Sequence, residues 1–409
     1  MPLFEGIGFT SEKTAVILDI GAAYTKCGFA GEIAPRCIIQ TKIKNRSGQE
    51  VNFCKSTNPD ELFELLKNFL HKLYFRHLLV NPKDRRVVIC ESLLAPAYFR
   101  DTLARVLFKH YEVPSVLFAP HHQLSLFTLG NSSGLVMDLG YSETLVIPIY
   151  EGIPVLKAWE SVPLGGEALH SRLEKILLET ATVTTDQDSE KPLSSAVSSL
   201  SEKVLEDIKV RCCFVTKLER AKLIQDNALK AHGFKEGDKS ELPPPPPGVK
   251  YPLDGGKMLF IEGRIRENLC ELLFEQDNEE KSVATLILDS ILKCPIDMRR
   301  YMAENLVITG GTSMLPGFKA RLKDELISLS EQPKYKNKLT LGEFKFHELP
   351  AKENYAAWLG GALFGALEIL AGRSLTKEKY KETGLIPDWA SIAKEPEAEE
   401  EKTAPLRQR

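Results

Sequence analysis

The chain has 409 residues, 43% of them apolar, so it can bury a sizeable core and is expected to divide into two lobes. Its formal charge of −3, without a basic stripe, argues against a general nucleic-acid binder. Eight cysteines are scattered without a C-x-x-C pair, which favours reduced cytosolic thiols over a zinc site. The most apolar helix expected, 356–370, is short and contains Glu368, which favours a buried core helix over insertion into a membrane.

The first predicted elements form a β-hairpin that recurs in the second half of the chain. Residues 15–21 and 134–140 are both apolar strands that end in Asp-x-Gly, and a second strand follows each of them. Two such hairpins can face each other across a cleft. Their turn N–H groups would then cradle phosphates, while the two aspartates would hold a hydrated divalent cation. The residues expected at these turns are Asp19, Gly21, Asp138 and Gly140.

The region between the hairpins begins with a short polar segment, 37–57, and continues as a helix. Asn58 can cap that helix, Pro59 suits its first turn, and Glu61 completes a capping box. From residue 87 to 134, apolar strands alternate with amphipathic helices. This alternation predicts a sheet covered by helices.

The neighbouring pair His121-His122 is open to two interpretations. It has the composition of a metal or acid–base pair. However, adjacent side chains on a helix point to different faces, and the sequence around the pair supplies no third ligand. A capping or surface role is therefore favoured.

Two polar inserts interrupt the second half. Residues 182–201 are rich in Ser, Thr and Asp, and residues 233–248 are charged and end in the five prolines 243–247. Both are expected to be exposed loops, the second stiffened as polyproline II. A spacer is favoured over a docking ligand for a partner domain.

Residues 306–318 predict a strand that feeds a helix through the Gly-rich loop 309–317. Adjacent glycines let backbone approach a ligand, and the helix that follows offers unpaired N–H groups. Taken alone, a Gly-Gly turn is more often ordinary loop chemistry. The two hairpins supply the partner loops that a nucleotide site needs.

Four motifs are spaced across nearly the whole chain: 26–31 with 34–36, 148–152, 310–317 and 358–361. They make the chain resemble the actin-related proteins, of the superfamily that contains actin, hexokinase and Hsp70. Three further segments, 74–82, 274–280 and 386–389, are similar within that family to the members at the pointed end of dynactin's short filament.

The resemblance implies an α/β, actin-like (ASKHA) fold of two lobes, built from a duplicated mixed sheet with flanking helices and a shortened subdomain 2. The short polar segment 37–57 replaces actin's longer one, whose loop grips the next subunit, although neutral trimming of a surface loop is the alternative. The expected divisions are 1–36, 80–134 and 345–392 for subdomain 1; 37–79 for subdomain 2; 135–164 and 275–344 for subdomain 3; 165–274 for subdomain 4; and 393–409 for a disordered tail.

The resemblance also implies a nucleotide cleft that has lost its catalytic groups. Ala22 and Ala23 stand where actins place a serine and a glycine, and Glu143 adds a negative charge near the phosphates. His121 and Leu145 stand where actins have the glutamine and the histidine that orient water. The resemblance then implies ATP or ADP with Mg as a structural ligand rather than a substrate. Its candidate binding residues are Asp19, Gly21, Lys26, Asp138, Gly140, Gly166, Lys209, Gly310, Gly311, Thr312 and Met314, with Asp19 and Asp138 holding the metal through water.

The function implied is structural. Such a protein would cap the pointed end of the dynactin filament in the cytoplasm, on a filament of actin-related protein 1 and actin. It would carry the other pointed-end subunits and act indirectly with dynein and cargo adaptors, without nucleic acid and without membrane insertion. The alternatives are a nuclear actin-related subunit of a chromatin remodeller and an active ASKHA ATPase or kinase.

Overall fold

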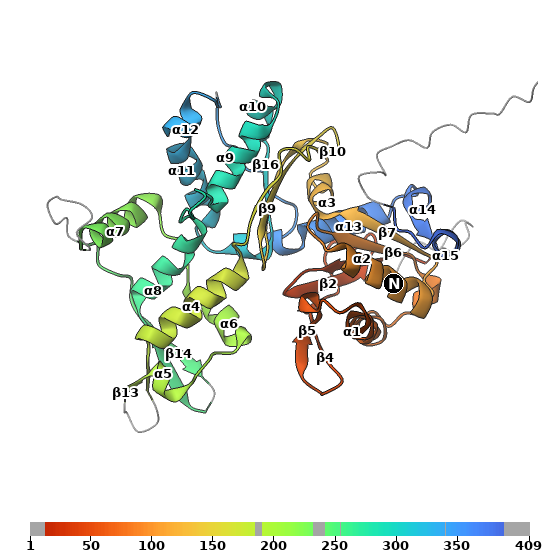
Figure 1. The fold of residues 1–409 in the computed structure, drawn as a ribbon, viewed down its shortest axis with the longest axis horizontal. Helices are drawn as coiled ribbons and strands as arrows, with labels where there is room; N and C mark the ends of the chain where they lie inside the picture. Colours follow the sequence, from red (N-terminus) through yellow and green to blue (C-terminus); the bar gives the residue numbers. More distant parts are fainter. Residues whose placement is uncertain (1–12, 185–189, 232–241, 254, 340, 388–409) are drawn as a thin grey trace, which may run out of the picture.

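The computed structural model describes residues 13–184, 190–231, 242–253, 255–339 and 341–387. These residues form two lobes, one built mainly from the first third of the chain together with its end and the other from the middle (Figure 1). The expected tail 393–409 and most of the insert 233–248 lie outside the described residues. Within the described ranges, no helix is both long and apolar enough to cross a bilayer.

The first lobe is built on a mixed sheet with the strand order β17-β7-β6-β1-β2-β3 in the described chain. β1 runs parallel to β6 and antiparallel to β2, so the first predicted hairpin is confirmed. Every residue of β6 is buried, as expected for a central strand covered on both faces. The strands are β1 (Val16–Ile20), β2 (Tyr24–Phe29), β3 (Cys37–Gln40), β6 (Val87–Glu91), β7 (Ser115–Pro120) and β17 (Leu375–Thr376).

Helices cover the two faces of this sheet because alternate residues of each strand point to opposite sides. Val16 and Leu18 join one apolar cluster with Phe69 of α1, whereas Ile17 joins another with Trp358 of α13. The helical segments of this lobe are η1 (Phe53–Lys55), α1 (Pro59–Lys72), η2 (Leu73–Leu78), η3 (Pro82–Asp84), α2 (Ala97–Arg105), η4 (Val106–His110), α3 (His121–Phe127), η7 (Glu353–Tyr355), α13 (Ala356–Gly365), α14 (Leu370–Arg373) and α15 (Lys377–Thr383).

The start of α1 differs in one detail from the prediction. Asn58 caps the helix by accepting from the N–H groups of Asp60 and Glu61, and Pro59 occupies the first turn, as expected. The predicted capping box is wrong, because the carboxylate of Glu61 accepts from the Ser56 hydroxyl at 3.2 Å instead of reaching back to the cap. Before α1, β4 (Lys42–Lys44) and β5 (Glu50–Asn52) form a short separate hairpin, which projects from the lower end of the first lobe (Figure 1).

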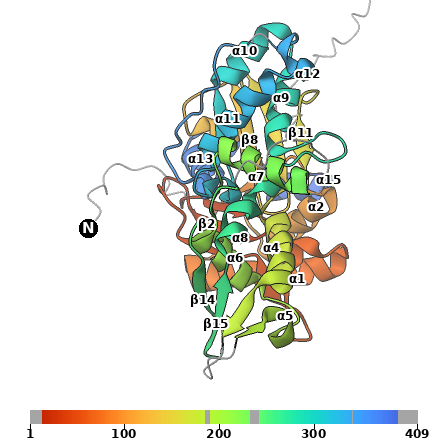
Figure 2. The same cartoon turned by 90° about the vertical axis from the view of Figure 1, so that its left-hand side faces the viewer.

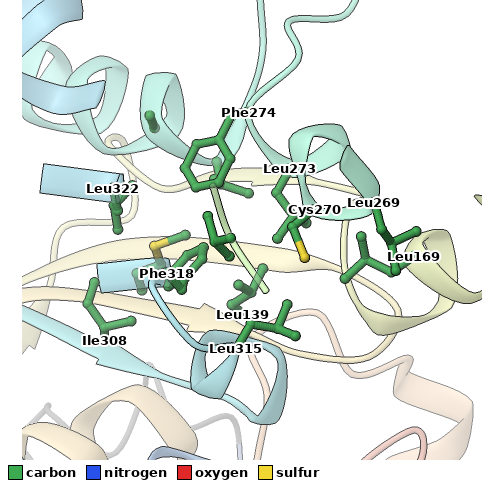
Figure 3. Packing of buried hydrophobic residues seen from close by; sticks show 14 of the residues in the cluster. Leu139, Leu169, Leu269, Cys270, Leu273, Phe274, Ile308, Leu315, Phe318 and Leu322 are labelled. Carbon is green, nitrogen blue, oxygen red and sulfur yellow. The ribbon is translucent and has the colours of Figure 1, made fainter. Parts of the chain in front are cut away.

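The second lobe repeats the arrangement of the first. β8 runs antiparallel to β9 and parallel to β16, as β1 does to β2 and β6, so the predicted duplication is confirmed. The side chains of Leu139, Ile308 and Phe318 converge in its core with those of the segment 269–274 (Figure 3). The strands are β8 (Gly134–Leu139), β9 (Thr144–Tyr150), β10 (Ile153–Pro154), β11 (Glu160–Val162) and β16 (Leu306–Thr309), and the helical segments are α9 (Val283–Lys293), α10 (Ile296–Glu304), η6 (Gly311–Met314), α11 (Phe318–Ser330) and α12 (Pro333–Lys336).

The far end of the second lobe carries a further sheet, of strand order β13-β12-β15-β14 in the described residues. Figure 2 places β14 and β15 below α6 and α8. Its strands are β12 (Thr182–Thr184), β13 (Glu190–Pro192), β14 (Val249–Leu253) and β15 (Lys257–Ile261), and its helical segments are α4 (Gly166–Thr180), α5 (Leu193–Ala196), α6 (Glu202–Cys212), α7 (Leu218–Ala231), α8 (Gly263–Asn268) and η5 (Leu269–Leu273).

Most of residues 190–201 are exposed, as predicted, but the prediction of a loop is wrong for 182–184 and 190–196, which form two strands and a short helix. β12 lies between β13 and β15, and the side chains of Val183 and Leu193 are fully buried. Each strand has only three residues, too short for periodicity to reveal in a polar stretch.

The proline segment is surface-lying, as predicted, but it is held against the protein. Arg220 and Arg264 donate to the carbonyls of Pro244 and Pro243 at 2.6 and 2.8 Å, and Arg266 donates to that of Pro247. Proline carbonyls keep their full acceptor capacity, so guanidinium groups can hold this segment without help from its missing N–H groups.

Candidate functional site

A cleft of about 740 Å³ lies where the two repeated hairpin turns and the Gly310 loop meet. With one exception, the predicted site residues line this cleft: Asp19, Gly21, Lys26, Asp138, Gly140, Lys209, Gly310, Gly311, Thr312 and Met314. Gly166 lies just behind the lining, where an added Cβ would come within 3.4 Å of the Lys209 ammonium. The fold therefore brings together residues from both halves of the chain.

The first turn pairs a carboxylate with a lysine. Asp19 and Lys26 are opposite residues of β1 and β2, and their side chains form an ion pair of 3.0 Å. The N–H of Gly21 donates to the Tyr24 carbonyl and closes the turn. No acceptor in the described residues bonds to the N–H groups of Ala22 and Ala23, so these groups are available to an anion.

The second turn is closed in the same way, by a hydrogen bond from the N–H of Gly140 to the Glu143 carbonyl. Its side chains differ from those of the first turn. Tyr141 donates its hydroxyl to Glu202 of α6. Burial and the neighbouring Asp138 raise the pKa of Glu143, which shows that two carboxylates share this end of the cleft. Repulsion of a phosphate by Glu143 stays a prediction.

The Gly310 loop is tied to the second turn by close backbone contact. Gly310 has φ +93°, and an added Cβ would lie 2.2 Å from the Leu139 carbonyl oxygen, so no larger residue fits there. Thr312 donates its hydroxyl to the Gly140 carbonyl at 2.7 Å. The close approach that requires glycine here is to the protein backbone of the second turn, and the predicted approach to a ligand stays a prediction.

Lys209, which is 5% exposed, donates to Glu206 at 2.6 Å, and the same carboxylate bonds to His170 at 2.8 Å. Burial raises the pKa of Glu206, but His170 and Lys209 outweigh it and lower the pKa to about 2. Glu206 lines the cleft and was missed by sequence reasoning. The signal that could have found Glu206 is its position three residues before Lys209, a spacing that places both side chains on one face of a helix.

The interpretation of His121-His122 as a capping or surface pair is wrong. His122 is only 3% exposed, and a ring nitrogen of each histidine lies within 4.8 Å of the other and of a carboxylate oxygen of Asp138. The third candidate ligand is thus Asp138 of β8, the element that follows α3 in the chain and lies against it. Burial, and secondarily His121, lower the pKa of His122 to about 4, so this imidazole is neutral at pH 7.

Comparisons with known proteins identify the family to which a chain with these duplicated hairpins belongs. A model of the actin family matches residues 10–386. The chain belongs to the actin family. Actin-related protein 10 of Dictyostelium discoideum is 30% identical to it, over 93% of this chain and 90% of that protein. Putative actin-29 of the same organism is 27% identical, over 91% of this chain and 95% of that protein.

These relatives confirm both the actin-like two-lobed fold and the specific resemblance, which the sequence indicated as actin-related protein 10, also called 11. The unpaired turn amides of Ala22 and Ala23 suit the phosphates of a nucleotide, and Lys26 and Lys209 line the same cleft in ion pairs with Asp19 and Glu206. The buried Leu145, opposite Asp138 on β9, offers no group that orients water.

Proposed function

We propose that this actin-family protein is a non-catalytic structural subunit that caps the pointed end of the dynactin filament and anchors the pointed-end complex. In this role it supports dynein-dependent transport along microtubules. Its proposed partners are the filament of actin-related protein 1 and actin, and the other pointed-end subunits, in the cytoplasm and cytoskeleton. Dynein and cargo adaptors act with it indirectly. The similarity to actin-related protein 10 supports this assignment over that of a generic actin.

The observation that carries the proposal is the small size of the β4–β5 hairpin. Its turn spans 45–49 and is closed by Asn45, whose side chain accepts from the N–H groups of Ser47 and Gln49 at 3.1 and 3.0 Å. At its base, Asn52 donates to the Ala22 carbonyl. A tight turn of this kind offers no extended loop for a further subunit to hold, so growth at this end would stop.

Loss of hydrolysis supports the same conclusion from the cleft. The first turn carries Ala22 and Ala23 where the family pattern has a serine and a glycine, and in the second turn Glu143 places a carboxylate close to Asp138. Like charges at a few Å in a partly dry cleft oppose a phosphate chain rather than stabilise its transition state. A nucleotide, where bound, would serve as a structural ligand between the lobes.

The test is purification of the tagged full chain from cytosol, followed by quantitative mass spectrometry of its stoichiometric partners. The expected result is recovery of actin-related protein 1 and the pointed-end subunits at fixed ratio. Recovery of chromatin-remodeller subunits without dynactin would overturn the proposal. Steady phosphate release from ATP by the pure protein would separately contradict the loss of catalysis.

A further inference from the structure

We propose that His121, His122 and Asp138 bind a divalent transition-metal ion of the zinc class directly, through two imidazole nitrogens and one carboxylate oxygen. This site differs from a nucleotide's hydrated magnesium, because the protein side chains themselves are the ligands. It needs no bound nucleotide.

Geometry provides the first support. The candidate ligand atoms lie within 4.8 Å of one another, and His121 Nδ1 lies 3.5 Å from Asp138 Oδ2. Bonds of about 2 Å to zinc place tetrahedral ligand atoms roughly 3.3 Å apart, so rotations of about 1 Å at the side-chain tips complete the site. Both histidines stand at the start of α3, directly after β7, and Asp138 stands in β8.

Unpartnered polar atoms provide the second support. The Nε2 atom of His122, on a side chain that is 97% buried, has no hydrogen-bond partner among the described residues, and neither has the buried Nδ1 of His121. Leaving such buried polar atoms unpaired is unfavourable. A metal ion satisfies nitrogen lone pairs that the surrounding protein leaves unused.

The charge of Asp138 provides the third support, which follows from comparing the equivalent aspartates of the two hairpins. In the first hairpin, Asp19 stands opposite Lys26 and pairs with it at 3.0 Å. In the second hairpin, the residue opposite Asp138 is Leu145. Among the described residues, the one ionic contact of Asp138 is with His121.

The other charges of the cleft do not neutralise Asp138. Lys209 is engaged by Glu206 at 2.6 Å, and Glu143 adds a second carboxylate that repels Asp138. A divalent cation is therefore attracted to this position and is not excluded by a neighbouring ammonium.

The ligand set selects the class of ion. Magnesium and calcium prefer oxygen ligands, whereas two imidazoles with one carboxylate suit zinc, cobalt or nickel. Asp138 and His121 line the cleft, so water can take the remaining position. Since β7 belongs to the first sheet and β8 to the second, the ion would join the two lobes at their contact.

The test uses the full chain, stripped with chelator and dialysed, and titrated with Co²⁺ as an optical substitute for Zn²⁺. We expect a visible ligand-field band that saturates at one equivalent and is displaced by Zn²⁺. His121→Gln and Asp138→Asn should each weaken binding at least about 100-fold, since losing a group that only orients a ligand already costs 10–100-fold. His71→Gln, at an exposed position on α1, is the matched control and should bind as the native chain does.

Circular dichroism verifies that each variant is folded. His122→Gln is the third variant, and if its buried position prevents folding, the other two decide the outcome. The proposal is overturned if no band forms at one equivalent, or if His121→Gln and Asp138→Asn retain the affinity of the control.

Discussion

The most demanding stability prediction concerns Arg321 on α11, a fully charged side chain that is 3% exposed. Its guanidinium donates two bonds of 2.8 Å to Glu271, further bonds to Glu325, and one to the Thr216 carbonyl at 2.8 Å. It also lies 4.6 Å from the ring centre of Phe274. We predict that Arg321→Met, which keeps most of the volume, will destabilise the protein strongly.

The magnitude follows from what the substitution leaves behind. Glu271 is 6% exposed, and removing its partner leaves a buried carboxylate without compensation. Breaking a buried ion pair from one side costs about 3–5 kcal/mol. Burial already raises the pKa of Glu271 above its usual value of 4.5 despite the adjacent arginine, so the variant should lose still more stability as pH rises above about 4.5, where the unfolded carboxyl ionises first.

The assay is equilibrium urea unfolding followed by circular dichroism. Arg300→Met is the matched control, because the Arg300–Glu304 pair lies on the surface and should leave the transition unchanged. Adding Glu271→Leu to Arg321→Met should restore part of the loss, since an apolar pair replaces an orphaned charge. Equal transitions for Arg321→Met and Arg300→Met would refute the reasoning.

Two further predictions concern the helices beside the cleft. Gly360→Ala should lower the free energy of unfolding by about 1–3 kcal/mol, because the new Cβ would lie 2.0 Å from a carbonyl oxygen of α3. The control is Gly372→Ala, which has open space around it and should be neutral or mildly stabilising in the same urea assay. The pKa of His122 is about 4 in the folded protein and 6.5 in the unfolded chain. Between these pH values the unfolded chain binds a proton that the folded protein does not, so the free energy of unfolding decreases as the pH is lowered from about 6.5 to 4. Measured with chelator present, the native chain should lose about 2 kcal/mol more than His122→Gln between pH 7 and pH 5, and parallel losses would contradict the buried neutral imidazole.

Much of the fold could be predicted because its signals are local. The strands at 16–20 and 134–139 are apolar runs bounded by Asp-x-Gly turns, and the helix 59–72 carries its own cap and period. The helix expected over 356–370 is buried as predicted at its start, where Gly360 of α13 lies against α3. These elements are therefore recognisable from their own residues.

The rest of the fold and of the site depends on contacts between segments, and these cannot be read from the residues of one segment. The strands at 182–184 and 190–192 are too short and polar to be recognised before β15 pairs with one of them. The convergence of Asp138 with the two histidines requires α3 to lie against β8, and no spacing rule gives that contact. These contacts are decided by how the strands pair and how the helices pack on them, which the sequence of one segment does not specify.

The same limit applies to the thiols. Cys27 and Cys37 stand opposite each other on β2 and β3 with their sulfur atoms 3.0 Å apart, although ten residues separate them in sequence. The hydrogen bond with the fully buried Cys27 thiol lowers the pKa of Cys37. Composition indicated reduced thiols but not this pairing.

The central claim is that this two-lobed chain ends a filament. The most direct measurement is single-filament fluorescence microscopy of actin-related protein 1 filaments, with the full-length chain labelled in a second colour. The account predicts one labelled molecule at the pointed end, no growth beyond it, and unchanged growth at the opposite end. Labelled molecules in the filament interior, or continued elongation past the label, would contradict it.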